Sequence, residues 1–157
     1  MTVKSAGILI YRKAPHLEVF LGHMGGPFWE QKDEGAWGIP KGLVDENETL
    51  IDAAVRECYE EVGFKVDPKG LRELGFVKMK TGKEVHAWAY EVEPGTEITI
   101  SSNTFDLEWP KGSGEIRQFP EVDRAEWFAV EIAIKKLINA QVEFLQRLKL
   151  LVSQVNS

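Results

Sequence analysis

The chain has 157 residues, of which 43% are hydrophobic and 28% are charged, and its formal net charge is −6. This length and composition are typical of one globular domain with its own core, and we expect a single domain over residues 1–157. The negative charge, without a run rich in Lys and Arg, argues against a duplex nucleic-acid partner, because binding to duplex phosphates needs clustered positive charge.

The chain before the first predicted helix is expected to form strands around one long loop. Alternating apolar and polar residues predict strands over 3–12 and 17–22. Residues 23–35 are rich in glycine and too long for a simple connection, which indicates a functional loop. A short strand is expected at 37–39, where the chain leaves this loop.

The strongest helix prediction runs from about Thr49 to Val62. Its apolar residues follow the i, i+3, i+4, i+7, i+11 spacing of one helix face, at positions Ile51, Ala54, Val55, Cys58 and Val62. Gly63 follows the last turn and is a natural C-cap.

The second half of the chain is expected to continue as strands and to end in a helix. The predicted strands are residues 71–80 and 83–93 joined at Thr81-Gly82, an edge strand at 98–100, and short pieces at 117–119 and 127–129. Residues 101–114 are polar and broken by Gly and Pro, which predicts a second loop. From Glu131 onward the apolar spacing predicts helix, broken near Asn139. The sum is an α+β chain.

Three carboxylates gather at the end of the predicted first helix. Glu57, Glu60 and Glu61 fall at i, i+3 and i+4, so they share one face, where like charges repel. A hard cation such as Mg²⁺ removes that repulsion, because it binds carboxylate oxygens and keeps positions for water and substrate phosphates. The cluster therefore predicts a metal site for phosphate chemistry. An acidic, solvated helix face is the alternative interpretation.

Residues 42–64 resemble the signature of the Nudix hydrolases, G-x5-E-x7-R-E-U-x-E-E-x-G-U, in which U is a bulky aliphatic residue. The positions that fit by type and spacing are Gly42, Glu48, Arg56, Glu57, Glu60, Glu61, Gly63 and Phe64. Cys58 and Phe64 stand where aliphatic residues are usual. Residues 36–42 resemble the Trp-x-x-Pro-Lys-Gly lead-in of this family. Residues 120–128 resemble the segment in which many members carry an additional metal-binding acid.

This resemblance implies the Nudix fold, a mixed β-sheet sandwiched between helices, and a Mg²⁺-dependent enzyme in which Mn²⁺ can substitute. The implied metal ligands are the carboxylates of Glu57, Glu60, Glu61 and Glu121 and the main-chain carbonyl of Lys41. The implied catalytic residues are Glu57, Glu60 and Arg56. Glu57 is the first choice for the general base and Glu121 the second, and Arg56 is expected to orient the acids.

Candidate substrate-binding residues come from the two predicted loops. Phe28, Trp29 and Trp109 are candidates to stack on a base, although packing over the core edge explains them equally well. Lys41 is a candidate contact for phosphate. Each loop carries aromatic and lysine residues, which resembles the predicted nucleoside-triphosphate pyrophosphohydrolases within the MutT-like part of the family.

The favoured function is metal-dependent cleavage of the pyrophosphate link in a nucleoside diphosphate joined to another moiety. The expected substrate is a small nucleotide, either a nucleoside triphosphate or a dinucleoside polyphosphate. Two alternatives stay open: a hydrolase of sugar-linked or inositol pyrophosphates, and a non-catalytic module that senses a nucleotide.

The cysteine content and the N-terminal sequence give an expected compartment. The single cysteine, Cys58, has no partner for an intrachain disulfide, which favours a reducing environment. The apolar run near the N-terminus is too short for a signal h-region or a membrane span. We therefore expect a cytoplasmic protein with no membrane partner. Apolar residues of the C-terminal helix leave both a monomer and a homo-oligomer open.

Overall fold

The computed structural model describes residues 2–13 and 15–155, so residues 1, 14, 156 and 157 of the predicted domain lie outside the described residues. Within the described ranges seven strands form one main sheet. Its central strands, in spatial order, are β3 (Trp37–Gly38), β2 (Glu18–Met24), β1 (Lys4–Arg12), β6 (Glu84–Glu91) and β5 (Arg72–Lys78). β4 (Lys41–Leu43) pairs with β1, and β9 (Val122–Ala129) pairs with β2. Only the β1–β6 pair of these is parallel, so the sheet is mixed.

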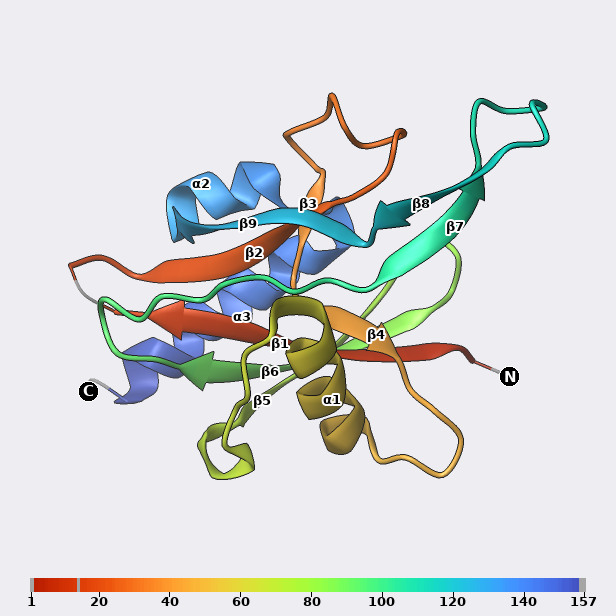
Figure 1. Cartoon of the computed structure of the whole chain (residues 1–157). Helices are drawn as coiled ribbons and strands as arrows, with labels where there is room; N and C mark the ends of the chain where they lie inside the picture. The colour runs from red at the N-terminus through yellow and green to blue at the C-terminus, as the bar shows by residue number, and fades with distance from the viewer. Residues whose placement is uncertain (1, 14, 156–157) are drawn as a thin grey trace.

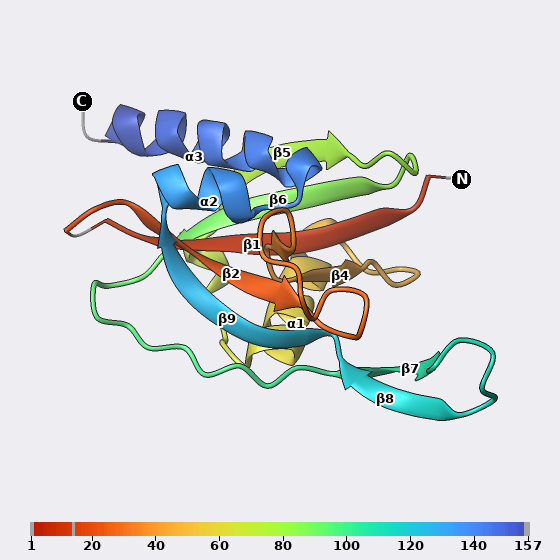
Figure 2. The ribbon, with the colours of Figure 1, turned by 90° about the horizontal axis from the view of Figure 1, so that it is seen from above.

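Helices cover both faces of this sheet (Figure 2). Successive side chains of a strand point to opposite faces, and β1 is apolar on both. Its residues Ala6, Ile8 and Ile10 belong to the core beneath α1 (Leu50–Val62), whereas Leu9 and Tyr11 belong to the core beneath α3 (Val142–Val155). The expected fold class is confirmed: an α+β chain with a mixed sheet sandwiched between helices.

The C-terminal segment forms two helices, as predicted. α2 (Val130–Lys136) has its C-cap at Leu137, and a short 3₁₀ turn, η2 (Asn139–Gln141), leads into α3. The predicted break near Asn139 is therefore confirmed. A second 3₁₀ turn, η1 (Pro68–Gly70), precedes β5. Among the helices that the structure describes, none has the length and apolar character needed to cross a bilayer.

The predicted loop over residues 101–114 is partly wrong. β7 (Thr104–Glu108) lies inside it and pairs with β8 (Ile116–Pro120) in a separate hairpin that extends from the body of the molecule (Figure 1). The Gly and Pro residues form only the turn of this hairpin. The half-buried Phe105 and Leu107 alternate with exposed residues along β7, which is a strand pattern.

Two further differences concern short segments. The edge strand predicted at residues 98–100 is absent from the described strands: Ile98 and Ile100 are partly buried against the core beneath α1, so their alternation comes from packing and not from sheet pairing. The Pro40-Lys41-Gly42 sequence is typical of a loop, because Pro and Gly interrupt strands, but residues 41–43 form β4, in which Gly42 pairs with Ala6 of β1. β4 therefore holds the start of the predicted signature against the sheet.

Candidate active site

Helix α1 presents its acidic residues away from the sheet because its apolar face is held firmly. Ala53, Ala54, Cys58 and Val62 are fully buried, and this burial raises the pKa of the Cys58 thiol to about 12. The helix begins at an N-cap in which the Thr49 hydroxyl accepts a hydrogen bond from the Asp52 N–H, at 3.1 Å. It ends at Gly63, which adopts the left-handed conformation with φ of 69°.

Arg56 organises the acids around it. Its Nε and Nη2 atoms donate to the two carboxylate oxygens of Glu48 at 2.8 and 2.9 Å. Its Nη1 atom donates to Glu57 at 2.7 Å and to Glu60 at 3.2 Å, and Nη2 also donates to the Leu43 carbonyl at 3.1 Å. All five N–H donors of the guanidinium are used within the chain. This arrangement gives Arg56 the geometry of a positioning residue.

Glu57 lies directly over the glycine that opens the signature. A Cβ atom added at Gly42 would stand 2.0 Å from the Glu57 carboxyl carbon, so only a glycine permits this approach. The Glu57 side chain is 15% exposed. The pairing of β4 with β1 and the seating of α1 on the sheet together bring this carboxylate and the glycine backbone into contact.

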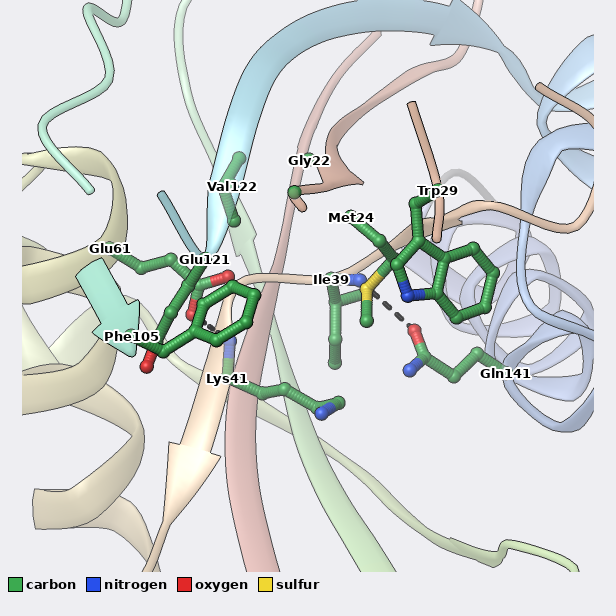
Figure 3. A pocket seen from close by; sticks show the side chains of 12 residues that line it. Gly22, Met24, Trp29, Ile39, Lys41, Glu61, Phe105, Glu121, Val122 and Gln141 are labelled. Atoms are coloured by element: carbon green, nitrogen blue, oxygen red, sulfur yellow. Dashed lines mark hydrogen bonds between the residues drawn. The ribbon is translucent and has the colours of Figure 1, made fainter. Parts of the chain in front are cut away.

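Glu61 of α1 and Glu121, the residue between β8 and β9, face each other (Figure 3). The Glu61 carboxylate accepts a hydrogen bond from the Lys41 backbone N–H, at 3.1 Å. Burial, and to a smaller extent the neighbouring Glu121 and Glu57 carboxylates, raise the pKa of Glu61 to about 8 against the opposing effect of Lys41. Burial, together with the charges of Glu57 and Glu60, also raises the pKa of Glu121.

The arrangement of these carboxylates shows how well they would fit a metal ion. Across residues 2–13 and 15–155, no three His, Cys, Asp or Glu side chains already stand close enough to share one ion. Glu57 and Glu60 are instead bonded to Arg56. The charges of Glu57 and Glu121 nevertheless raise the pKa of Glu61, and those of Glu57 and Glu60 raise the pKa of Glu121, so these four carboxylates lie near enough to repel one another. Hard oxygen donors and unbalanced negative charge of this kind suit a divalent cation.

A pocket of about 270 Å³ opens beside these acids. Its lining includes Glu61, Glu121 and Lys41 at one end and Trp29 at the other (Figure 3). The remaining lining residues are Gly22, Met24, Gly25, Gly38, Ile39, Phe105, Val122 and Gln141. The pocket therefore joins an acidic end to a largely apolar chamber, which is the usual character of a small-ligand site.

The predicted substrate-binding residues occupy different places. Trp29 and Lys41 line the pocket. Phe28 and Trp109 do not line it: their rings pack edge to face at a centroid distance of 5.4 Å, and Phe28 is 60% exposed. Their contact joins the 23–35 loop to the end of the β7–β8 hairpin.

Sequence reasoning missed two pocket residues that the fold brings in from elsewhere. Phe105 comes from β7, in a segment whose composition predicts a loop. Gln141 comes from η2 and is fully buried. Phe105 could have been found by the aromatic criterion that selected Trp109. Gln141 gave no signal, because a single amide within a helical pattern is ordinary.

Comparison with known proteins agrees with this architecture. A model of the NUDIX domain matches residues 1–148. The chain is 31% identical over 118 residues to the asymmetrical bis(5'-nucleosyl)-tetraphosphatase of Rattus norvegicus, covering 69% of this chain and 79% of the rat protein. It is 34% identical over 94 residues to an uncharacterized 17.7 kDa protein of Enterobacteria phage T4, covering 59% of this chain and 61% of that protein.

A solved structure shows the same fold. The crystal structure of a C. elegans Ap4A hydrolase binary complex superimposes with a TM-score of 0.70 at 23% identity, over 96% of this chain and 98% of that one. The match to the NUDIX domain covers most of the sequence and includes the carboxylate helix, its glycine and the acidic end of the pocket. The chain belongs to the Nudix hydrolase family.

Proposed function

We propose that the protein is a metal-dependent hydrolase that cleaves the pyrophosphate link of a nucleoside diphosphate joined to another moiety. Nucleoside triphosphates and dinucleoside polyphosphates are the proposed substrates. The observation that carries this proposal is that Glu61 and Glu121 line one end of a pocket whose other end is apolar and aromatic, with Glu57 and Glu60 near enough on α1 to raise the pKa of Glu121. The proposal also draws on the family membership.

In this proposal the acidic end holds Mg²⁺, with Mn²⁺ as a substitute, through Glu57, Glu60, Glu61, Glu121 and the main chain of Lys41. The bound cation would supply charge neutralisation of the phosphates and a more acidic water. Arg56, anchored by Glu48, holds Glu57 and Glu60 at the edge of the site. These contacts fix carboxylates that would otherwise separate because of their like charges.

A carboxylate must also accept the proton of the attacking water. Glu57 is the first candidate and Glu121 the second, as the family resemblance implies. Glu57 is held by Arg56 and by its contact over Gly42, so its position is well determined. Glu121 is more exposed and lines the pocket, so a water can reach it.

The test replaces Glu57 and Glu61 separately by Gln and measures turnover of a phosphoanhydride panel with Mg²⁺ or Mn²⁺. Each variant keeps the side-chain shape, and Glu61→Gln retains an amide oxygen for the Lys41 N–H, so we expect folded proteins. We expect kcat/KM to fall by about 100-fold or more, since both metal binding and proton acceptance need the charged carboxylate. Glu73→Gln, at an exposed position on β5, is the matched control and should retain wild-type rates.

Near-normal rates in both Glu57→Gln and Glu61→Gln would overturn the proposed role of the carboxylates. The panel includes sugar-linked and inositol pyrophosphates beside the nucleotides. Turnover of those compounds alone would replace the proposed substrate class. Saturable nucleotide binding without hydrolysis under either metal would identify a sensing module instead.

A further inference from the structure

One histidine that does not line the pocket is bonded to two of the segments that do. His23 of β2 is fully buried, and its ring lies edge to face against Trp37 at a centroid distance of 5.0 Å. Its Nε2 atom bonds to the Lys32 carbonyl at 2.6 Å, and its Nδ1 atom bonds to the Asp123 carboxylate at 2.8 Å. The ring therefore joins the 23–35 loop to β9.

The two bonds specify where the hydrogens lie. A carbonyl oxygen can only accept, so the His23 Nε2 atom donates to Lys32. A hydrogen must also lie between Nδ1 and the Asp123 oxygen, because two lone pairs would otherwise face each other. An asparagine at position 123 could supply this hydrogen from its amide and keep both bonds. An alanine could not, and would leave a buried ring nitrogen without a partner.

On the loop side, the His23 bond supports the turn that carries Trp29. The Lys32 N–H donates to the Trp29 carbonyl at 2.9 Å, so the Lys32 backbone links this turn to His23. The Lys32 ammonium also lies 5.2 Å from the centre of the Trp29 ring. Trp29 lines the pocket, and His23 thereby limits its movement relative to β2.

On the strand side, the His23 bond holds an irregular point of β9. His23 pairs with Arg124 across the β2–β9 ladder. The next residue, Met24, pairs with Val122, so Asp123 is an extra residue without a partner in β2. Such β-bulges redirect side chains and are frequent next to active sites. The bond from His23 fixes the side chain of this extra residue and so stabilises the bulge.

The bulge lies next to the acidic end of the pocket. Glu121 and Val122, the two residues before Asp123, both line the pocket. The Glu121 carbonyl accepts a hydrogen bond from the Gly25 N–H at 2.9 Å, so the contact with the chain after β2 continues beyond the bulge. A change in the bulge would therefore move the Glu121 carboxylate relative to Glu61 on α1.

We propose that His23 is a positioning residue that holds Trp29 and Glu121, at opposite ends of the pocket, in a fixed relation to each other. The inference rests on the proposed function, which assigns Trp29 to substrate and Glu121 to the metal. The Nε2 bond serves the apolar end and the Nδ1 bond serves the acidic end, so the two bonds can be removed separately. The ring is fully buried, so it acts only through these neighbours.

Replacement of Asp123 tests the bond at the acidic end. In metal-free protein, Asp123→Ala should speed hydrogen exchange of the Gly25 amide, which is bonded to the Glu121 carbonyl, by about tenfold. It should also weaken Mn²⁺ binding, measured by electron paramagnetic resonance of the free ion, by about tenfold. Asp123→Asn loses the same charge but keeps the bond, so both values should stay within about twofold of wild type. Glu126→Ala, at an exposed position on β9, is the matched control and should follow wild type.

Replacement of His23 by asparagine tests the bond at the apolar end. The asparagine amide reaches the position of Nδ1 but not that of Nε2, so the contact with Asp123 is kept and the contact with Lys32 is lost. We expect the Lys32 amide to exchange about tenfold faster, and KM for ATP with Mg²⁺ to rise about tenfold while kcat stays within about threefold. Partial unfolding would lower kcat and leave KM unchanged, so this difference separates positioning from a loss of stability.

The exchange measurements need no turnover, so they separate this inference from the proposed function. Faster exchange that asparagine at position 123 restores, in a protein that hydrolyses no phosphoanhydride, would support the role of His23 and reject the proposed function. Unchanged exchange at Gly25 in Asp123→Ala, or equal losses in Asp123→Ala and Asp123→Asn, would overturn the inference. The Asp123 variants decide it alone should His23→Asn fail to fold, because the Asp123 side chain is 26% exposed.

Discussion

At the scale of single residues, the site depends on side chains that are held closely by what surrounds them. Glu61 is partly buried with its carboxylate on the Lys41 N–H, and its pKa is raised to about 8. Glu57 is pressed over the backbone of Gly42. A bound divalent cation would favour the charged form of both acids, because an opposite charge at short range stabilises a carboxylate.

Gly42→Ala tests this close contact. The added methyl group would stand about where the Glu57 carboxylate lies, so that flexible side chain must move away. We expect kcat/KM to fall by about tenfold or more, since small displacements of catalytic groups are costly, while the melting temperature changes little. The control is Leu43→Ala at the next position, which is 55% exposed and should keep its activity. Normal activity in Gly42→Ala would show that the position of Glu57 does not matter.

At the scale of secondary structure, α1 acts together with the loop that precedes it. Glu48 stands just before the helix and binds Arg56 through both oxygens, and the Glu48 carboxylate also accepts from the Asp45 N–H at 3.0 Å. The bonds from Arg56, followed by the Asp45 N–H, lower the Glu48 pKa from 4.5 to about 2. The loop is thereby fixed to the helix face that carries the proposed catalytic acids.

This linkage predicts a specific pH dependence of folding. Between pH 4.5 and about 2 the unfolded chain protonates Glu48 while the folded chain does not, so its contribution to stability is present above that window and is lost as pH falls through it. We expect Glu48→Gln to reduce the free energy of unfolding at pH 7 by about 1 kcal/mol. The difference from wild type should shrink toward pH 3.

Urea denaturation of both proteins at pH 7 and at pH 3 measures this effect. Glu46→Gln, exposed in the same loop, is the control and should follow wild type at both values. An equal pH dependence in Glu48→Gln and wild type would contradict the linkage.

At the scale of the whole molecule, two cores on opposite faces of one sheet set the relative positions of α1 and α3. The face beneath α3 includes the fully buried Phe144, Leu145 and Leu148. η2 leads directly into this helix, so the packing of α3 also places Gln141 beside β3. The pocket is therefore assembled from segments distant in sequence, including Trp29, Phe105 and Gln141.

Leu148→Ala measures how strongly this layer supports the fold. The side chain is fully buried, and its truncation leaves a cavity, so we expect the free energy of unfolding to fall by about 2–5 kcal/mol. Leu150→Ala, on the same helix but 65% exposed, should change it by less than about 0.5 kcal/mol. Urea denaturation of the two variants measures this free energy. A similar small decrease in both variants would mean that α3 is not part of the main core.

The sequence by itself determined the features that depend on local spacing. The period of the apolar residues specified α1 to within a residue, Gly63 specified its end, and the signature spacing placed Glu57, Glu60 and Glu61 on one helix. The resemblance of that signature to the Nudix hydrolases then implied the rest of the fold, a mixed sheet sandwiched between helices. Such features follow from neighbours a few positions apart, for which helical geometry alone fixes proximity.

Only the tertiary structure decided which distant residues share the pocket. Gln141 meets Ile39 across 102 positions, and Glu121 reaches Glu61 only because β9 returns to pair with β2. Tertiary packing likewise places Trp29 in the lining of the pocket and leaves its neighbour Phe28 exposed. Contacts of this kind depend on how whole elements pack, and periodicity carries no information about them. Local spacing thus determined the carboxylates of α1, and the packing of the fold brought Glu121 and the apolar end of the pocket to them.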